Sequence, residues 1–298
     1  MFKPIVVGVD GSREGAAAAE WAAREAVRRG LPLRIVHAWE GMPPDDTEAD
    51  LPELKVPQYW ARRVLRTTVE QLGARHPQLY MAAEQVRRPP RPALLAEAER
   101  AELLVLGSQG LGGMGGVLAG SVAMDTVAHA RRPVVLVRAG QGAESEHLPG
   151  TDGATSTRTP FRDIALALDF GQPYDTLLEF AFRAAEFRKA PLRIVHAWHH
   201  PLARGVPSTE DRANARAAVQ RDLEAALQPW REKFSAIPVE DSVTEGRAVH
   251  QIVKAARGAG LLVVGRRARR TAIGAHTGPV THAAIHHATC PVAVVPHD

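Results

Sequence analysis

The chain has 298 residues, which is long for one α/β domain and enough for two domains of about 140 residues each. Hydrophobic residues make up 45% of it and charged residues 23%, so the composition is globular and excludes a disordered protein. A net charge of +4 is too small for a surface that coats nucleic acid, and no stretch approaches the ~18 apolar residues of a membrane helix. We therefore expect a cytoplasmic protein that binds neither nucleic acid nor membrane.

Short apolar runs alternate with Ala-rich or amphipathic stretches through the first half of the chain. Strands are expected at residues 4–9, 33–39, 79–86, 103–107 and 134–137. Helices are expected between them, at residues 15–29, 58–75, 92–100 and 121–130. Several of these strands are apolar nearly throughout, as in a parallel sheet that is covered on both faces. The alternation predicts an α/β fold with a doubly wound parallel sheet, whose ligand lies beyond the carboxyl ends of the strands.

The second half of the chain repeats the first. The eight residues PLRIVHAW begin at Pro32 and occur again from Pro191, 159 residues further on. The same offset carries Asp10 onto Asp169, and an offset of 158 carries Gly107 onto Gly265. Only a duplication explains so many matching residues at a nearly constant offset.

The duplication predicts two tandem five-stranded domains, at residues 1–140 and 160–298. Residues 141–159 between them are rich in Gly, Ser and Thr and show no apolar periodicity, which is typical of a flexible linker. The single cysteine, Cys290, precedes an apolar run, so we expect it to act as a small buried hydrophobic residue.

Asp10 ends the first expected strand and is followed by Gly11 and Ser12. A carboxylate at this point could cap the next helix, or it could accept hydrogen bonds from the ribose or adenine of a nucleotide. The two roles are compatible.

The loop after the fourth strand carries a spaced set of glycines. It reads Gly107-Ser-Gln-Gly110, then nine residues, then Gly120-Ser121 at the start of a helix. Glycines let the backbone approach a ligand closely, and the N–H groups and partial positive charge of a helix start attract phosphate. A surface loop without a ligand is the alternative, but the position between an apolar strand and a helix favours a phosphate site.

Residues 110–115, GLGGMG, also match a dinucleotide fingerprint. That fingerprint belongs directly after the first strand of its unit, whereas this run starts three residues after the fourth strand and has no counterpart in the second half. We therefore disfavour a nicotinamide cofactor. Neither a G-x-x-x-x-G-K-[ST] loop nor a G-x-S-x-G motif is present, so no catalytic residue is expected.

The spacing G-x-x-G, nine residues, G-[S/T], with an Asp at the end of strand one, resembles the ATP-binding subclass of the universal stress protein family. The resemblance covers both halves and implies the strand order 3-2-1-4-5 in each. It implies ATP as the ligand, with or without Mg²⁺, and a stress or dormancy regulator that is not a catalyst. In the family, the Asp and a main-chain group after strand two hold adenosine, while the loop and the helix start hold ribose and phosphates. These positions carry over to Asp10, Ala38, Gly107, Gly110, Gly120, Ser121 and Val122.

The second half departs from this pattern. Its loop reads Gly265-Arg-Arg-Ala268, nine residues, Gly278-Pro279. Pro279 removes a hydroxyl and a backbone N–H from the helix start, although proline is favoured there structurally. We expect a weaker second site formed by Asp169, Gly265 and Gly278. The arginines of this loop could collect an anion, or they could form a solvated basic loop.

Three functions remain open: an ATP-binding regulator, a slow ATPase or phosphotransferase that uses the same crevice, and an ATP-free interaction scaffold. The intact first motif argues against the scaffold, and the lack of a positioned base argues against the enzyme. His196, His199 and His200 suggest a metal, but no complete set of ligands appears at metal-binding spacing, so none is expected.

The fifth strand of each half, at residues 134–137 and 292–295, is apolar and should be paired or covered. The resemblance implies dimerisation through this strand. We therefore expect an internal pseudo-dimer, and the sequence leaves a further homodimer open.

Overall fold

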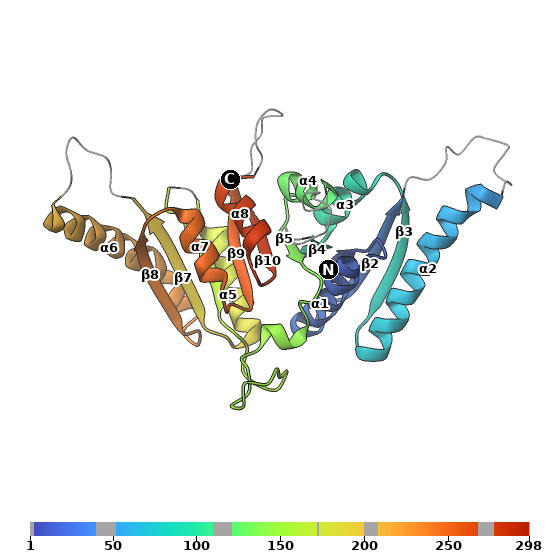
Figure 1. Cartoon of the computed structure of the whole chain (residues 1–298), viewed down its shortest axis with the longest axis horizontal. Coiled ribbons are helices and arrows are strands. Elements are labelled where there is room, and N and C mark those ends of the chain that lie inside the picture. The colour runs from blue at the N-terminus through green and yellow to red at the C-terminus, as the bar shows by residue number, and fades with distance from the viewer. Residues whose placement is uncertain are drawn as a thin grey trace. The chain divides into compact units, whose positions relative to one another are not determined.

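The computed structural model describes residues 3–39, 52–109, 121–171, 173–199, 208–267 and 277–297. The chain divides into two compact units, Met1–Gly142 and Ala143–Asp298, and each is an α/β unit built on a parallel sheet (Figure 1). The expected fold class is confirmed in both units.

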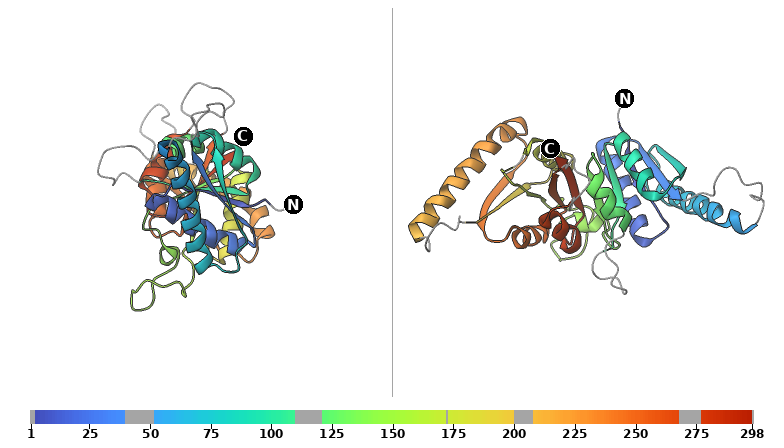
Figure 2. Two further views of the ribbon diagram at one scale, coloured as in Figure 1. Left: turned by 90° about the vertical axis from the view of Figure 1, so that its right-hand side faces the viewer. Right: turned by 90° about the horizontal axis from the view of Figure 1, so that it is seen from above.

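Unit 1 has the strand order β3-β2-β1-β4-β5, and every neighbouring pair is parallel. Helix α1 packs against α2, and α3 packs against α4, as expected of a sheet covered on both faces (Figure 2). The elements are β1 (Ile5–Gly8), α1 (Arg13–Arg29), β2 (Leu33–Trp39), α2 (Pro52–Arg75), β3 (Met81–Arg87), α3 (Pro90–Arg100), β4 (Leu103–Gly107), α4 (Ser121–His129) and β5 (Val134–Val137).

Unit 2 has the corresponding order β10-β9-β6-β7-β8, again with parallel neighbours. Cys290 is buried before the last strand, as the sequence predicted. The elements are η1 (Ala143–Glu146), β6 (Ile164–Ala167), α5 (Asp175–Arg188), β7 (Leu192–Trp198), α6 (Thr209–Lys233), β8 (Val239–Glu245), α7 (Ala248–Ala256), β9 (Leu261–Arg267), α8 (Pro279–His287) and β10 (Val292–His297).

Helix α1 is the central helix of unit 1, and its ends are set by local sequence. Ser12 is the N-cap and accepts a hydrogen bond from the Gly15 N–H, while Gly30 closes the helix in the left-handed conformation with φ of 64°. Small alanines let the helix approach β1 and β4 closely, and the Trp21 side chain is fully buried among them. This packing fixes where the start of α1 meets the sheet.

The strand register brings the predicted site residues to one edge. Gly8 of β1 pairs in register with Val36 of β2 and with Leu106 of β4. Strands β1 and β4 therefore end within one residue of the same level, and β2 continues three residues past Val36, to Trp39. The residues that follow Gly8, Val36 and Leu106, including the site positions Asp10, Ala38 and Gly107, lie together at the carboxyl edge of the sheet.

The segment expected as a flexible linker carries defined structure and clusters with unit 2. It contains the 3-10 turn η1, followed by an antiparallel bridge between His147 and Phe161 whose rings lie 4.0 Å apart. The Arg162 N–H donates to the Glu146 carbonyl at 2.8 Å, and the Leu148 N–H donates to the Pro160 carbonyl at 2.9 Å. Its glycine- and serine-rich composition gave no sign of this hairpin.

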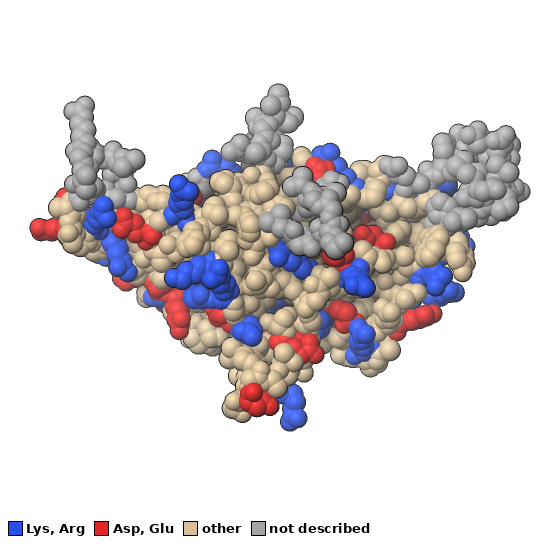
Figure 3. Space-filling view, in the orientation of Figure 1, with Lys and Arg blue, Asp and Glu red and all other residues tan. Residues whose placement is uncertain are grey.

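None of the described helices is long and apolar enough to cross a membrane. On the face drawn in Figure 3, the Lys and Arg side chains of the described residues are interspersed with Asp and Glu. They do not merge into one broad basic surface on that face.

Candidate functional site

A cleft of about 330 Å³ opens at the carboxyl edge of the unit 1 sheet. The ends of β1, β2 and β4 form its floor, and the starts of α1, α3 and α4 form its walls. It is lined by Gly8, Val9, Asp10, Ser12, Glu14, Gly15, Val36, Ala38, Pro90, Leu94, Leu106, Gly107, Gln109, Val122 and Ala123.

The Asp10 carboxylate is held at the mouth of this cleft by the start of α1. Its Oδ1 accepts hydrogen bonds from the Ser12 N–H at 3.0 Å and from the Ser12 hydroxyl at 2.5 Å. Ser12 Oγ in turn accepts from the Gly15 N–H at 2.9 Å. The helix cap is therefore Ser12, and Asp10 is oriented through it with its carboxylate exposed at the site.

Gly107 brings the backbone at the end of β4 directly against the start of α1. A Cβ at this position would lie 2.6 Å from the Glu14 carbonyl carbon and 2.7 Å from the Gly15 nitrogen, which no side chain tolerates. The glycine is therefore required by packing, whatever the ligand does. It also leaves the rim of the cleft as bare main chain.

The start of α4 forms another wall of the cleft. Ser121 is its first residue, and Val122 and Ala123 line the cleft. The free N–H groups of the first helical turn carry a partial positive charge, which favours an anion at this end of the cleft. The predicted positions Gly110 and Gly120 lie outside the described residues.

One histidine supports the floor of each cleft: His37, which the sequence analysis did not single out, and His196, which it considered as a metal ligand. Nδ1 of His37 donates to the Val9 carbonyl at 2.7 Å, and Nδ1 of His196 donates to the Leu168 carbonyl at 2.9 Å. Both histidines belong to the repeated PLRIVHAW segment. The candidate metal ligand His196 is thus a brace between β6 and β7, and its ring lies 4.5 Å from that of Phe170.

Unit 2 has a cleft of about 340 Å³ at the matching edge. It brings together the three predicted residues Asp169, Gly265 and Gly278, with Pro279 at the first position of α8. Oδ1 of Asp169 accepts a hydrogen bond from the Gly171 N–H at 3.0 Å.

The walls of the two clefts differ. A Cβ on Gly265 would lie 2.8 Å from Nε2 of His297, so an imidazole occupies the place that backbone takes beside Gly107. Helix α5 begins only at Asp175, after Tyr174, which makes no side-chain capping bond. Arg266 is buried, and this burial lowers the pKa of its guanidinium.

The structure brings together all of the predicted first-site residues that it describes: Asp10, Ala38, Gly107 and Val122, with Ser121 at the head of α4. Sequence reasoning missed Glu14, Gly15, Pro90, Leu94 and Gln109 as lining residues. Only Gly15 had a local signal, because it follows the N-cap Ser12 by three positions. Among the described residues, no group of three or more His, Cys, Asp or Glu side chains could hold a metal ion.

Two doubly wound units, each with a polar cleft at the strand ends, define a tandem protein of the Rossmann-like α/β class. The model of the universal stress protein family matches residues 1–138 and again residues 160–296. The chain belongs to the universal stress protein family and is a tandem, two-domain member of it.

Relatives of the same length share this organisation. Universal stress protein Rv2005c of Mycobacterium tuberculosis is 32% identical over 306 residues, which cover 97% of this chain and 96% of the relative. Universal stress protein Rv2623 of the same organism is 29% identical over 300 residues, with 97% and 95% covered. A universal stress protein of Archaeoglobus fulgidus has the same fold, with a TM-score of 0.67 at 15% identity over 99% of this chain and 98% of that one.

Proposed function

We propose that the unit 1 cleft binds ATP with Mg²⁺, and that the protein is a nucleotide-dependent stress regulator with little or no catalytic turnover. The observation that carries the proposal is the convergence of Asp10, Gly107 and the start of α4 on one cleft. These are the groups that a nucleoside polyphosphate needs: an acceptor for hydroxyl groups, a close backbone approach and an anion site.

Each part of the nucleotide has a place in this arrangement. The Asp10 carboxylate accepts hydrogen bonds from the ribose hydroxyls, and the main chain near Ala38 contacts the adenine. The phosphates extend along Gly107 toward the start of α4, where free N–H groups favour negative charge. The volume of about 330 Å³ falls within the range of about 300–1,000 Å³ that is usual for ligand pockets.

The test is calorimetric titration of the full chain with MgATP, after mass spectrometry of any nucleotide that is released from the purified protein. Asp10→Ala should weaken ATP binding roughly tenfold or more, since it removes charge-assisted hydrogen bonds worth about 1.5–3 kcal/mol. The matched change Asp169→Ala, at the same position of unit 2, should leave that affinity unchanged. Equal losses from the two variants would contradict the assignment of the tight site to unit 1.

The second candidate is slow ATP hydrolysis, which the presence of Glu14 in the cleft favours because a carboxylate could orient water. We expect steady-state turnover far below the ~10 s⁻¹ of a median enzyme. A rate near that value, lost in Glu14→Gln with ATP affinity retained, would establish the enzyme instead of the regulator.

A further inference from the structure

A groove of about 540 Å³ runs between α2 and β3 in unit 1, away from the nucleotide cleft. Strand β3 is the last strand in the order of this unit, and α2 lies beside it (Figure 1). The groove is lined by Arg62, Leu65, Arg66, Val69 and Glu70 of α2 and by Ala83 and Gln85 of β3.

Two hydrogen-bond donors of the groove, Gln85 and Arg62, have no acceptor among the described residues. The Gln85 Nε2 atom is buried and has no hydrogen-bond partner. Arg62 makes no hydrogen bond or ion pair with any residue that the structure describes. The Arg66 guanidinium lies 3.9 Å from the Glu70 carboxylate, and both side chains are 68% exposed. A buried amide donor without an acceptor is unfavourable, so the groove is suited to an incoming oxygen acceptor.

Unit 2 shows what fills the matching groove. At an offset of 158, Arg62 corresponds to Gln220 and Ala83 corresponds to Asp241. The Asp241 carboxylate accepts a hydrogen bond from Gln220 Nε2 at 2.7 Å, and it also pairs with Arg231. In unit 2, Asp241 of β8 therefore supplies the carboxylate. The matched residue of unit 1, Ala83 of β3, has only a methyl group.

The outer edge of β3 is also open to pairing. Within the described residues, β3 is hydrogen-bonded to β2 and to no other strand. Ala82 and Ala83 are exposed, and the charged residues of β3, Glu84 and Arg87, lie in the second half of the strand. Such an edge accepts an added strand readily, and peptide-binding domains use the same mode of recognition.

We propose that the groove between α2 and β3 of unit 1 docks an extended acidic segment of a partner protein. The segment adds a strand to the free edge of β3 and places a carboxylate among Arg62, Arg66 and the buried Gln85 amide. The carboxylate takes the role that Asp241 has in unit 2. This surface is separate from the nucleotide cleft, so the test does not depend on ATP binding.

The probe is a fluorescein-labelled peptide with the β8 sequence VEDSVTE, titrated with the full chain at low salt and followed by fluorescence anisotropy. We expect saturable binding that becomes about tenfold weaker or more when the peptide carries Asp241→Ala, since a charge-assisted hydrogen bond is lost. Arg62→Gln in the protein should weaken binding by a similar factor. Arg221→Gln, which removes an exposed arginine from α6 of unit 2, is the matched control and should have no effect.

Ala83→Asp provides the sharpest test, because it installs in unit 1 the carboxylate that unit 2 already has. This variant should remain folded by thermal unfolding and should lose peptide binding. Hydrogen exchange at the amides of Met81–Arg87 should slow when the peptide is bound to the unaltered chain.

Absence of saturable binding, or binding that survives Ala83→Asp, would overturn the proposal. If free glutamate displaced the peptide with an affinity equal to that of the peptide, and hydrogen exchange at the β3 amides did not slow, the groove would be a site for small carboxylates. That result would also overturn the docking of a strand.

Discussion

Packing against α1 requires a glycine at position 107, and so does the proposed close approach of the ligand to the backbone. A methyl group there would overlap the backbone of Glu14 and Gly15, so Gly107→Ala should force α1 away from the end of β4. We expect a loss of about 1–3 kcal/mol in the free energy of unfolding, the usual cost of overpacking, together with weaker ATP binding. Urea denaturation monitored by circular dichroism measures the first effect.

Gly73→Ala is the matched control for this prediction. Gly73 lies within α2, and a Cβ there would meet only the Met81 side chain at an ordinary 3.8 Å. The variant should be stabilised by up to about 1 kcal/mol, because alanine is the better helix former. A destabilised Gly73→Ala, or a neutral Gly107→Ala, would contradict this account.

Residue types could be predicted from the sequence, but their partners could not. The spacing of Gly107 indicated a ligand loop, while the structure adds that this glycine packs on α1, a contact between segments more than 90 residues apart. The sequence did not predict the hydrogen bonds of His37 and His196, because their acceptors are main-chain carbonyls that follow another strand. Contacts of this kind depend on register, which a single sequence does not display.

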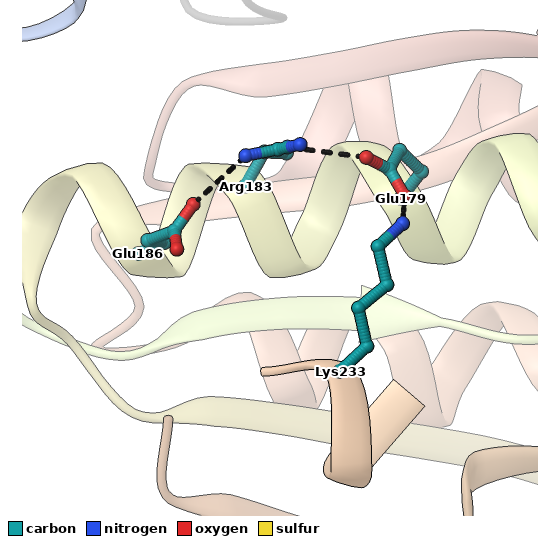
Figure 4. A network of polar contacts seen from close by, with 4 residues as sticks. All are labelled: Glu179, Arg183, Glu186 and Lys233. Carbon is teal, nitrogen blue, oxygen red and sulfur yellow. Dashed lines mark hydrogen bonds and ion pairs between the residues drawn. The ribbon is translucent and has the colours of Figure 1, made fainter. Parts of the chain in front are cut away.

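At the scale of elements, a polar network fastens α5 to the end of α6. The Glu179 carboxylate receives hydrogen bonds from Lys233 of α6 and from Arg183 of its own helix, and Arg183 also bonds to Glu186 (Figure 4). Burial alone would raise the pKa of Glu179, but the hydrogen bonds from Lys233 and Arg183 outweigh it and lower the pKa below 4.5.

A carboxyl group with a lowered pKa stabilises the fold while it is ionised. The contribution of Glu179 is therefore present at neutral pH and is lost as the pH falls below about 4.5, through the folded pKa. Because the group is partly exposed, Glu179→Gln should cost only about 0.5 kcal/mol at pH 7. Between pH 5 and about 3, the variant should lose stability less steeply than the unaltered chain in urea titrations.

Glu240→Gln changes an exposed residue of β8 and serves as the control. Identical dependence of stability on pH in Glu179→Gln and in the unaltered chain would contradict the role of the network.

Helices and strands were predicted well where periodicity was strong, and less well at their ends. The strands at residues 33–39, 103–107 and 134–137 have the predicted bounds. Helix α2 begins at Pro52, six residues before the expected start: proline is favoured at the first helical position, but the helix also runs through Pro57 in its second turn. Helix α5 begins later than its counterpart α1, since Gly171 stands where α1 has its Ser12 cap.

At the scale of the molecule, the duplication predicted the fold twice over, and it also supplies internal controls. Asp10 of the first cleft corresponds to Asp169 of the second, and Gly107 corresponds to Gly265. They differ where His297, Tyr174 and Pro279 enter the second cleft. The offset in the sequence located the Pro279 difference, but His297 and Tyr174 became apparent only from their positions in space.

These differences predict unequal nucleotide sites, with about one tight ATP site per chain. Pro279 at the start of α8 lacks two donors that a serine offers at the matched position 121, the backbone N–H and the hydroxyl, and the His297 ring fills the space beside Gly265. The loss of two donors, each worth about 1.5–3 kcal/mol, weakens binding by roughly two or more orders of magnitude. Calorimetry should therefore give a stoichiometry near one for the tight phase.

Exchanging the residue at the helix start tests the cause of this inequality. Ser121→Pro installs in unit 1 what unit 2 has, and it should weaken the tight ATP site roughly tenfold or more, because a backbone donor to phosphate is removed. Pro279→Ser restores that donor in unit 2 and should strengthen ATP binding only at the weak second site. The gain should be incomplete, since His297 still occupies the space beside Gly265. Adding His297→Ala, the residue type of the matched position 139, should strengthen the weak phase further. Two equal sites in the unaltered chain, or a tight site that is indifferent to Ser121→Pro, would show that the starts of α4 and α8 do not decide where ATP binds.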